Sequence, residues 1–337
     1  MEHRGIMSSG NWVVDYVKII DHLPERNMLA SIIGESAGLG GAPHNVLVGL
    51  AVLDPSLPLF AGGMIGKDAG GELVIEAVDN HKINRRFLYQ EAGISTSYTY
   101  VMTESATGHR TFFHHRGANA FLGPEHFERI DVPARIFHLG YLLLLDLLDS
   151  PDPDFGVVAA VVLKRLSEQG YKVSVDVISE ESDRYLTVVL PCLPYIDYLI
   201  INETEAGRIC GLPVRGVSGE IDRQTLSLAA KFLLDKGIRD TIVIHFPEGG
   251  YALSRTGEEA FQASFRMEPG EIKGTVGAGD AFCAGMLYAF HENWPLTRGL
   301  ELANANAAIS LTHPTSTGAA KSLAEVLDFA RSRLVRG

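Results

Sequence analysis

The sequence predicts an α/β protein with a mostly parallel central sheet, helices on both faces of that sheet, and a small separate β-sheet. From about residue 125 onward, strand-like apolar runs alternate with helix-like runs, a pattern typical of βαβ units. Two N-terminal segments break this alternation and have the composition of strands that pair with each other. The chain has 337 residues, 46% of them hydrophobic, and no internal repeat, so we expect residues 1–337 to form a single domain.

Hydrophobic periodicity and turn residues place the individual elements. Strands are expected at 12–20 and across 96–115, with a turn at Thr107-Gly108, and with their flanks they give a lid at about 10–32 and 95–118. The other segments are expected as a helix at 155–166, a strand at 171–177, a strand at 195–201, a helix at 226–236 and a strand at 241–245. Gly170 and Gly237 follow the two helices and would end them.

Composition and charge disfavour several classes of protein. The net charge of −12 disfavours a protein that binds nucleic acid or an anionic membrane. No apolar run reaches the roughly 18 residues of a membrane span, and the first residues form no hydrophobic signal region. The three cysteines have no C-x-x-C spacing and suggest neither a disulfide framework nor a zinc site. We therefore expect a cytoplasmic protein in a reducing compartment.

The segment GTVGAGDAF at 274–282 is the strongest candidate for a reactive site. It places small residues before a helix expected at 281–290, and the free N–H groups of a helix N-terminus bind anions such as phosphate. The small residues 277–279 let a phosphate oxygen approach these donors. Asp280 would then accept the proton of a substrate hydroxyl as that hydroxyl attacks phosphorus. From these residues alone, Asp280 is equally suited to cap the helix.

The longer segment GTVGAGDAFCAGML resembles the C-terminal signature of the ribokinase-like (PfkB-type) carbohydrate kinases. Six further segments are similar to motifs of that family, in the expected order and over most of the chain. They are GNWVVDYV with Asp15, GLGGAPHN with Gly40, Gly41 and Asn45, GGMIGKDAGG with Gly63, Gly66, Asp68 and Gly71, the lid segment TGHRTFFHHRGANAFL, INETEAG with Asn202 and Glu205, and ANANAAISLTHP with Asn304.

The resemblance implies a ribokinase-like three-layer α/β/α sandwich with a β-sheet lid, and ATP-dependent phosphorylation of a hydroxymethyl group on a sugar or sugar-like molecule. Asp280 would be the general base, and the backbone of Gly277, Ala278 and Gly279 would be the anion hole. The residues expected to bind the sugar are Asp15, Gly40, Gly41 and Asn45, and Arg116 in the lid could reach a phosphate or an acidic sugar. The residues expected to bind ATP are Asn202, Glu205, Gly249, Thr275 and Asn304, with Glu205 also holding Mg²⁺ through water.

The chain departs from the family pattern at three places. Gly274 stands where the signature usually has an aspartate that helps to hold a monovalent cation, so activation by potassium stays an open question. Phe246 replaces the first glycine of a Gly-x-x-Gly loop whose second glycine is Gly249, which would alter the nucleotide site. Pro43 and His44 precede Asn45 where commoner members carry other residues, and this would affect the choice of sugar.

Two other functions remain open from the sequence. A nucleoside kinase of the same fold would use the lid aromatics Tyr98, Tyr100 and Phe113 to stack on a base. A regulator without catalytic activity would keep the scaffold and bind sugar or nucleotide only. In the family that the chain resembles, lids commonly pair between subunits, so the resemblance also implies a homodimer through the lid.

Overall fold

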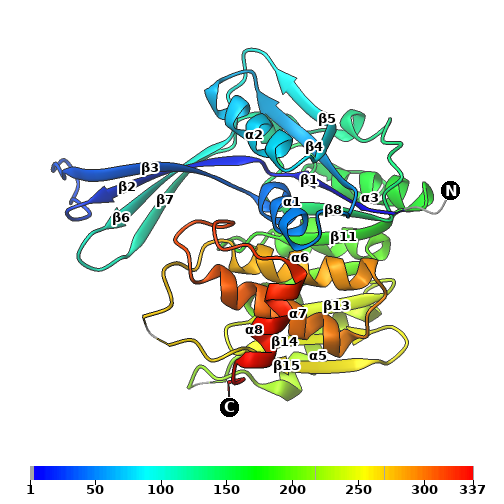
Figure 1. Cartoon of the computed structure of the whole chain (residues 1–337). Coiled ribbons are helices and arrows are strands. Elements are labelled where there is room, and N and C mark those ends of the chain that lie inside the picture. The colour runs from blue at the N-terminus through cyan, green and yellow to red at the C-terminus, as the bar shows by residue number, and fades with distance from the viewer. Residues whose placement is uncertain (1–3, 217, 269, 337) are drawn as a thin grey trace.

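A computed structural model describes residues 4–216, 218–268 and 270–336 and has a nine-stranded sheet at its centre (Figure 1). Its strands are β1 Ile6–Gly10, β4 Leu59–Gly66, β5 Asn84–Glu91, β8 Ile136–Leu142, β11 Lys172–Val177, β12 Tyr198–Asn202, β13 Thr241–Phe246, β14 Gly249–Ser254 and β15 Glu259–Ala263. They follow the order β5-β4-β1-β8-β11-β12-β13-β14-β15. The strands from β5 to β13 are parallel, and β14 and β15 extend the sheet as antiparallel strands.

Helices cover both faces of this sheet and give two apolar cores. One face carries α1 Ala42–Leu53, α2 Ala69–Asn80, α6 Ala278–His291, α7 Leu296–Ser310 and α8 Leu323–Ser332, and the other carries α3 Val158–Glu168, α4 Glu203–Cys210 and α5 Arg223–Asp235. Neighbouring strand residues point to opposite faces, so Ile200 belongs to the core under α6 and α7 while Leu199 and Ile201 belong to the other. The result is the three-layer α/β/α arrangement that the resemblance implied.

A second sheet of four strands projects from the main body (Figure 1). Its strands are β2 Val13–Ile20, β3 Ile32–Gly40, β6 Tyr98–Glu104 and β7 Arg110–His115, in the order β3-β2-β6-β7. Strand β3 lies beyond the range 10–32 that the sequence analysis gave to this part of the lid. Its sequence, IIGESAGLG, contains three glycines, which weaken the signal of a strand.

Short elements explain most differences between the expected and observed boundaries. They are β9 Pro151–Asp152, β10 Gly156–Val157, the 3₁₀ turns Gly117–Phe121, Pro124–His126 and Leu190–Tyr195, and a π-helical turn at Tyr185–Val189. The helix expected from residue 155 begins at Val158 because β10 precedes it, and the strand expected from 195 begins at Tyr198 because a 3₁₀ turn precedes it. Within the described residues, no helix has both the length and the apolar character needed to cross a membrane.

Candidate active site

Helix α6 begins with backbone N–H groups that no other part of the described chain satisfies. Gly277 is the N-cap and has a φ of 79°, and a Cβ at this position would lie 2.5 Å from the Cβ of Ser316. Among the described residues, the amides of Gly277, Gly279 and Asp280 donate to no protein acceptor, whereas that of Ala278 donates to the Thr275 carbonyl at 3.4 Å. These free donors, at the positive end of the helix dipole, are suited to hold a phosphate group.

The carboxylate of Asp280 lies in the first turn of α6 but does not cap the helix. Its Oδ2 accepts a hydrogen bond from Asn45 Nδ2 at 2.7 Å, and its Oδ1 accepts one from the Tyr141 hydroxyl at 2.8 Å. Burial raises the pKa of Asp280, and these two hydrogen bonds lower it. The N-cap, Gly277, receives no side-chain hydrogen bond, so the alternative of a purely capping Asp280 is wrong.

A second carboxylate, Asp15 on β2, approaches Asp280 from the lid. Burial raises the pKa of Asp15 to about 6; a hydrogen bond with Thr99 opposes the rise and the negative charge of Asp280 adds to it. Gly40 on β3 gives this carboxylate its space, because a Cβ at position 40 would lie 2.5 Å from Asp15 Oδ2. Two carboxylates so placed suit a ligand that has several hydroxyl donors.

Gly41 and Asn45 join the lid to the first turn of α1. Gly41 has a φ of 86°, and a Cβ there would lie 1.8 Å from the Asn11 carbonyl oxygen, so a larger residue cannot make this crossing. Asn45 Oδ1 lies 2.9 Å from His44 Nδ1, which orients the amide so that its Nδ2 donates to Asp280. Asn45 therefore holds the carboxylate of the expected base, a contact that the sequence analysis did not foresee.

Asn202 and Glu205 form a reciprocal cap at the start of α4, at the carboxyl end of β12. Asn202 Oδ1 accepts from the Glu205 amide at 2.9 Å, and Glu205 Oε2 accepts from the Asn202 amide at 2.8 Å. Glu205 Oε1 accepts from the Ser179 hydroxyl at 2.6 Å and from Asn202 Nδ2 at 2.7 Å. Burial raises the pKa of Glu205 to about 7, and these hydrogen bonds lower it. Because both of its carboxylate oxygens already accept hydrogen bonds, Glu205 is suited to contact a metal through a water molecule.

Asp176 on β11 adds a third carboxylate that suits a magnesium ion. Burial raises its pKa well above the usual range, and the charges of Glu205 and Asp280 raise it further. Its only hydrogen bond within the described chain comes from the Val177 amide to Oδ1 at 2.7 Å, which leaves Oδ2 without a partner. Mg²⁺ prefers carboxylate oxygens and retained waters, so Asp176 and Glu205 are a donor set that fits this ion.

A cavity of about 880 Å³ opens beside the N-terminus of α6. Its lining includes five of the residues expected at the nucleotide site or the anion hole, namely Asn202, Thr275, Ala278, Gly279 and Asn304. Asn304 Nδ2 donates to the Gln262 carbonyl at 3.1 Å, which fixes this side chain. Residues 334–336 form another wall, because Val335 makes a β-bridge with Phe265. The volume lies in the range of about 300–1,000 Å³ that is typical of cofactor sites.

Phe246 and Gly249, at the hairpin between β13 and β14, differ in their relation to this cavity. Phe246 lines it and packs on Phe261, with ring centroids 5.9 Å apart. Gly249 does not line it, and a Cβ there would lie 2.3 Å from the Gln262 carbonyl oxygen, so this glycine allows the close approach of β15. A contact between Gly249 and ATP stays a prediction.

The strand register of the lid separates two sets of side chains. Asp15 pairs with Thr99, and Thr99 pairs with His114, so these three lie on one face of the lid. Tyr100 pairs with Phe113, and Tyr98 is two residues before Tyr100, so these aromatics lie on the opposite face. A nucleoside kinase would stack these aromatic side chains on a base. They therefore point away from the face that carries Asp15.

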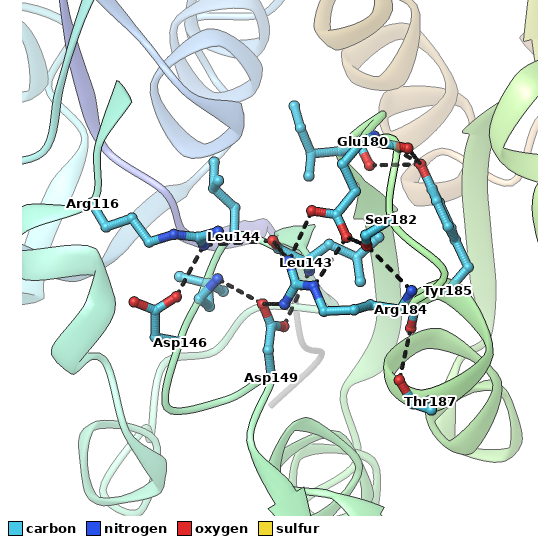
Figure 2. Close-up of polar contacts among 12 residues, drawn as sticks. Arg116, Leu143, Leu144, Asp146, Asp149, Glu180, Ser182, Arg184, Tyr185 and Thr187 are labelled. Carbon is cyan, nitrogen blue, oxygen red and sulfur yellow. Dashed lines mark hydrogen bonds and ion pairs between the residues drawn. The ribbon is translucent and has the colours of Figure 1, made fainter. Parts of the chain in front are cut away.

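Arg116 lies just after β7, at the base of the lid, and has no hydrogen bond with Asp280 or Asp15. Its Nη1 is 3.1 Å from Asp146 Oδ1 and 3.5 Å from the Leu143 carbonyl oxygen (Figure 2). The lid position expected for Arg116 is therefore observed, and its neighbours belong to the turn after β8.

The sequence analysis missed three residues at this site: Tyr141, Asp176 and His245. His245 lines the cavity, and a Cβ on Gly279 would lie 3.3 Å from its Cε1 atom. Each of the three lies in β8, β11 or β13, at or near the carboxyl end where parallel sheets bind ligands, and this position is the signal that could have found them. Behind Asp176, the buried His138 and Cys283 bring their ligand atoms within 4.8 Å of its carboxylate, a grouping that sequence spacing does not reveal.

Comparison with known proteins identifies the family of the chain. Residues 13–322 match the profile described as pfkB family carbohydrate kinase. The chain belongs to this family. It is therefore a phosphotransferase of the carbohydrate kinase type, which confirms the enzyme class that the resemblance implied.

Individual members of the pfkB family resemble the chain over most of its length. An ATP-dependent ribose-1-phosphate kinase of Halopiger xanaduensis is 26% identical over 333 residues, which cover 96% of this chain and 99% of that protein. A 5-dehydro-2-deoxygluconokinase of Clostridium beijerinckii is 26% identical over 293 residues, which cover 80% and 77%. The structure of Arabidopsis thaliana ribokinase complexed with ribose and ATP has a TM-score of 0.80 at 22% identity and covers 97% of this chain and 99% of that one. The predicted ribokinase-like fold is confirmed.

Proposed function

We propose that this pfkB kinase transfers the γ-phosphoryl group of ATP to a hydroxymethyl group of a sugar or sugar-like molecule. One observation carries the proposal: the Asp280 carboxylate lies beside the free amides of Gly277 and Gly279, between the nucleotide-sized cavity and Asp15 of the lid. This arrangement puts a proton acceptor, an anion hole and a hydroxyl-binding carboxylate around one point.

The chemistry follows from these groups. Asp15 and the main chain around Gly41 bind hydroxyl groups of the sugar, and Asp280 accepts the proton of the attacking hydroxyl. The amides at the start of α6 stabilise the negative charge on the transferred group. The bond between the γ-phosphorus and the oxygen that leaves with ADP breaks as the sugar hydroxyl attacks. Mg²⁺, held by Asp176 and Glu205 in part through water, would neutralise charge on the phosphates. The lid closes over the site and keeps water from competing as the acceptor.

The substrate classes of the relatives fall into neutral and anionic sugars. Ribokinase acts on a neutral sugar, whereas the relatives from Halopiger and Clostridium are kinases of a sugar phosphate and of a sugar acid, by their names. The orientation of Tyr98, Tyr100 and Phe113 away from Asp15 favours a sugar over a nucleoside. We also propose a homodimer through the lid, because the lid exposes large apolar side chains.

Asp280→Asn tests the proposed role of the base. The variant keeps the size of the side chain but removes the acceptor, so kcat should fall about 10²- to 10⁴-fold while the Kd values for sugar and ATP change little. Steady-state ADP release across a panel of sugars, together with calorimetric binding, measures both quantities. The matched control is Asp328→Asn, which changes an exposed aspartate of α8 and should leave kcat unaltered.

Two outcomes would contradict the proposal. Turnover that survives in Asp280→Asn would remove the base from the mechanism. Sugar binding without ADP formation across the whole panel would instead support the non-catalytic regulator.

A further inference from the structure

Two arginines from distant parts of the chain meet at the turn after β8. Arg116 comes from the base of the lid, and Arg184 comes from the loop that follows β11. Arg184 Nη2 donates to the Leu143 carbonyl at 2.6 Å, and Arg116 Nη1 donates to the same oxygen at 3.5 Å (Figure 2). Their side chains are 36% and 32% exposed, so two half-buried guanidinium groups from the body and the lid lie side by side.

The surrounding carboxylates leave several donors of this arginine pair free. Glu180 accepts from Nε and Nη2 of Arg184, while Asp149 lies 3.6 Å from Arg184 Nη1, beyond a hydrogen bond. Asp146 is an ion-pair partner of Arg116 without hydrogen-bond geometry. Each guanidinium has five N–H donors. Within the described chain, Nε and Nη2 of Arg116 and Nη1 of Arg184 donate to no acceptor.

The carboxylates also have separate tasks. Asp149 is buried and accepts from the Leu143 and Leu145 amides at 3.1 and 3.0 Å, so it shapes the turn on which the arginines meet. Glu180 accepts from the Nε–Nη2 edge of the Arg184 guanidinium, Nη2 also donates to the Leu143 carbonyl, and Nη1 keeps its donors for another acceptor. Asp146 is 50% exposed, so its side chain can turn into solvent when another anion takes its place on Arg116.

Asn11 and Tyr141 link the turn on which the arginines meet with the carboxylate of the proposed base. Asn11 Nδ2 donates to the Leu144 carbonyl at 3.0 Å, and Asn11 Oδ1 accepts from the Tyr141 amide at 2.6 Å. The Tyr141 hydroxyl donates to Asp280. The turn to which both arginines bind therefore follows directly after β8, the strand whose Tyr141 contacts Asp280.

The lid gives a second connection between the arginine pair and the sugar site. His114 Nδ1 lies 3.0 Å from the Thr99 hydroxyl, and Thr99 is next to Asp15 in register on the same face. Arg116 is two residues after His114, at the end of the same strand. Arg116 thus follows the lid strand whose face includes His114, in register with Thr99 and Asp15, and neither Arg116 nor Arg184 lines the nucleotide cavity.

We propose that the sugar substrate carries an anionic group, either a phosphate ester or a carboxylate, and that Arg116 and Arg184 bind this group. The inference rests on the proposed kinase function and adds the substrate class. Guanidinium groups bind phosphate and carboxylate through paired N–H donors, and two of them can share one anion. Because one arginine belongs to the lid and one to the body, the anion would also join the lid to the body.

Matched pairs of neutral and anionic sugars test the inference. Ribose against ribose 1-phosphate examines a phosphate ester, and glucose against gluconate examines a carboxylate. We expect one anionic member to bind at least about tenfold more tightly than its neutral partner, and to be phosphorylated with a higher kcat/KM. The Kd from calorimetry should rise with ionic strength for the anionic member only.

Substitutions of the two arginines test whether the preference for an anionic sugar depends on them. Arg116→Gln and Arg184→Gln should each reduce the anionic-to-neutral ratio of kcat/KM by about 10- to 100-fold, because a charge-assisted contact is lost. Asp146→Asn removes the competing carboxylate and should tighten binding of the anionic sugar. The control Arg165→Gln changes an arginine of α3 that pairs with Glu128 and should leave the ratio unaltered.

The outcomes separate this inference from the proposed function. Equal binding and turnover of both members in each pair would overturn the anionic substrate, while the kinase proposal would stand. Preferential binding of the anionic sugar with no ADP formed would support the arginine subsite and overturn the kinase proposal. Should Arg184→Gln fail to fold, Arg116→Gln still decides, because Arg116 makes a single long hydrogen bond in the described structure.

Discussion

At the scale of single residues, the reactivity of Asp280 depends on two neighbours from distant parts of the chain. Burial raises the pKa of this carboxyl group, since burial disfavours the charged form. The Tyr141 hydroxyl and the Asn45 amide both donate to it and favour the carboxylate. Tyr141 and Asn45 therefore oppose the effect of burial and favour the ionised form of Asp280, which is the form that can accept a proton.

Tyr141→Phe should shift the acidic limb of the pH profile of kcat/KM to higher pH. The hydrogen bond from Tyr141 lowers the pKa of Asp280, so its loss raises that pKa, and the base becomes protonated at a higher pH. The size of the shift reflects the loss of one hydrogen bond, about 1 kcal/mol. Initial rates between pH 5 and 9 measure the limb. The control Tyr195→Phe should keep the wild-type pH profile. An acidic limb that stays unchanged in Tyr141→Phe would show that Asp280 is not the titrating base.

The sequence predicted some of these residues and not others. Asp280 could be predicted because its role is indicated by the local pattern of small residues before a helix. Tyr141 and Asp176 were missed, because only their position near the carboxyl ends of strands marks them and they reach the site when strands far apart in the sequence become neighbours. Tyr141 and Asp280, for example, are separated by 139 positions. The role of Asn45 was missed for the same reason, since its partner is 235 positions away.

At the scale of elements, the turn into α6 is the feature that exposes amides to a phosphate. Gly277 adopts the left-handed conformation and packs against Ser316, so the next peptides direct their N–H groups outward. The reciprocal cap of α4 instead satisfies the amides of Asn202 and Glu205 and fixes their side chains at the end of β12. The strands β11, β12 and β13 and the helices α3 and α5 were predicted because their periodicity is strong, whereas β3 was missed because its glycines weaken the strand pattern.

Gly277→Ala should weaken ATP binding and lower the stability of the protein. A Cβ at this position meets Ser316 at 2.5 Å and occupies a left-handed conformation, which alone costs about 1–2 kcal/mol. Gly211→Ala is a matched control, because Gly211 has a φ of 67° with no atom near the added Cβ. Thermal unfolding should show a larger loss for Gly277→Ala, and the KM for ATP should rise for that variant only. Equal effects of the two substitutions would mean that the turn has no part in nucleotide binding.

At the scale of the whole molecule, the lid is a separate sheet that brings Asp15 to a site built by the main body. The lid also exposes apolar side chains that an isolated chain would leave in water, among them Phe112 at 59% and Ile33 at 61% exposed. Exposed apolar groups of this kind mark surfaces that associate. Burial of the lid of one subunit against that of another would remove them from solvent.

Phe112→Glu and Ile33→Glu should convert the proposed dimer into monomers. Each substitution places a charge in the apolar surface of the lid, and a buried unpaired charge opposes association. Light scattering coupled to size-exclusion chromatography measures the mass. Leu228→Glu is the control, because Leu228 lies on α5 and is 51% exposed. A wild-type mass of one chain would reject the dimer, and so would a dimer unaffected by both lid substitutions.

The pairing of Val335 with Phe265 has a practical consequence for anyone who handles this protein. Residues 334–336 form a wall of the nucleotide cavity, so a fusion partner or affinity tag joined after them would begin at its rim.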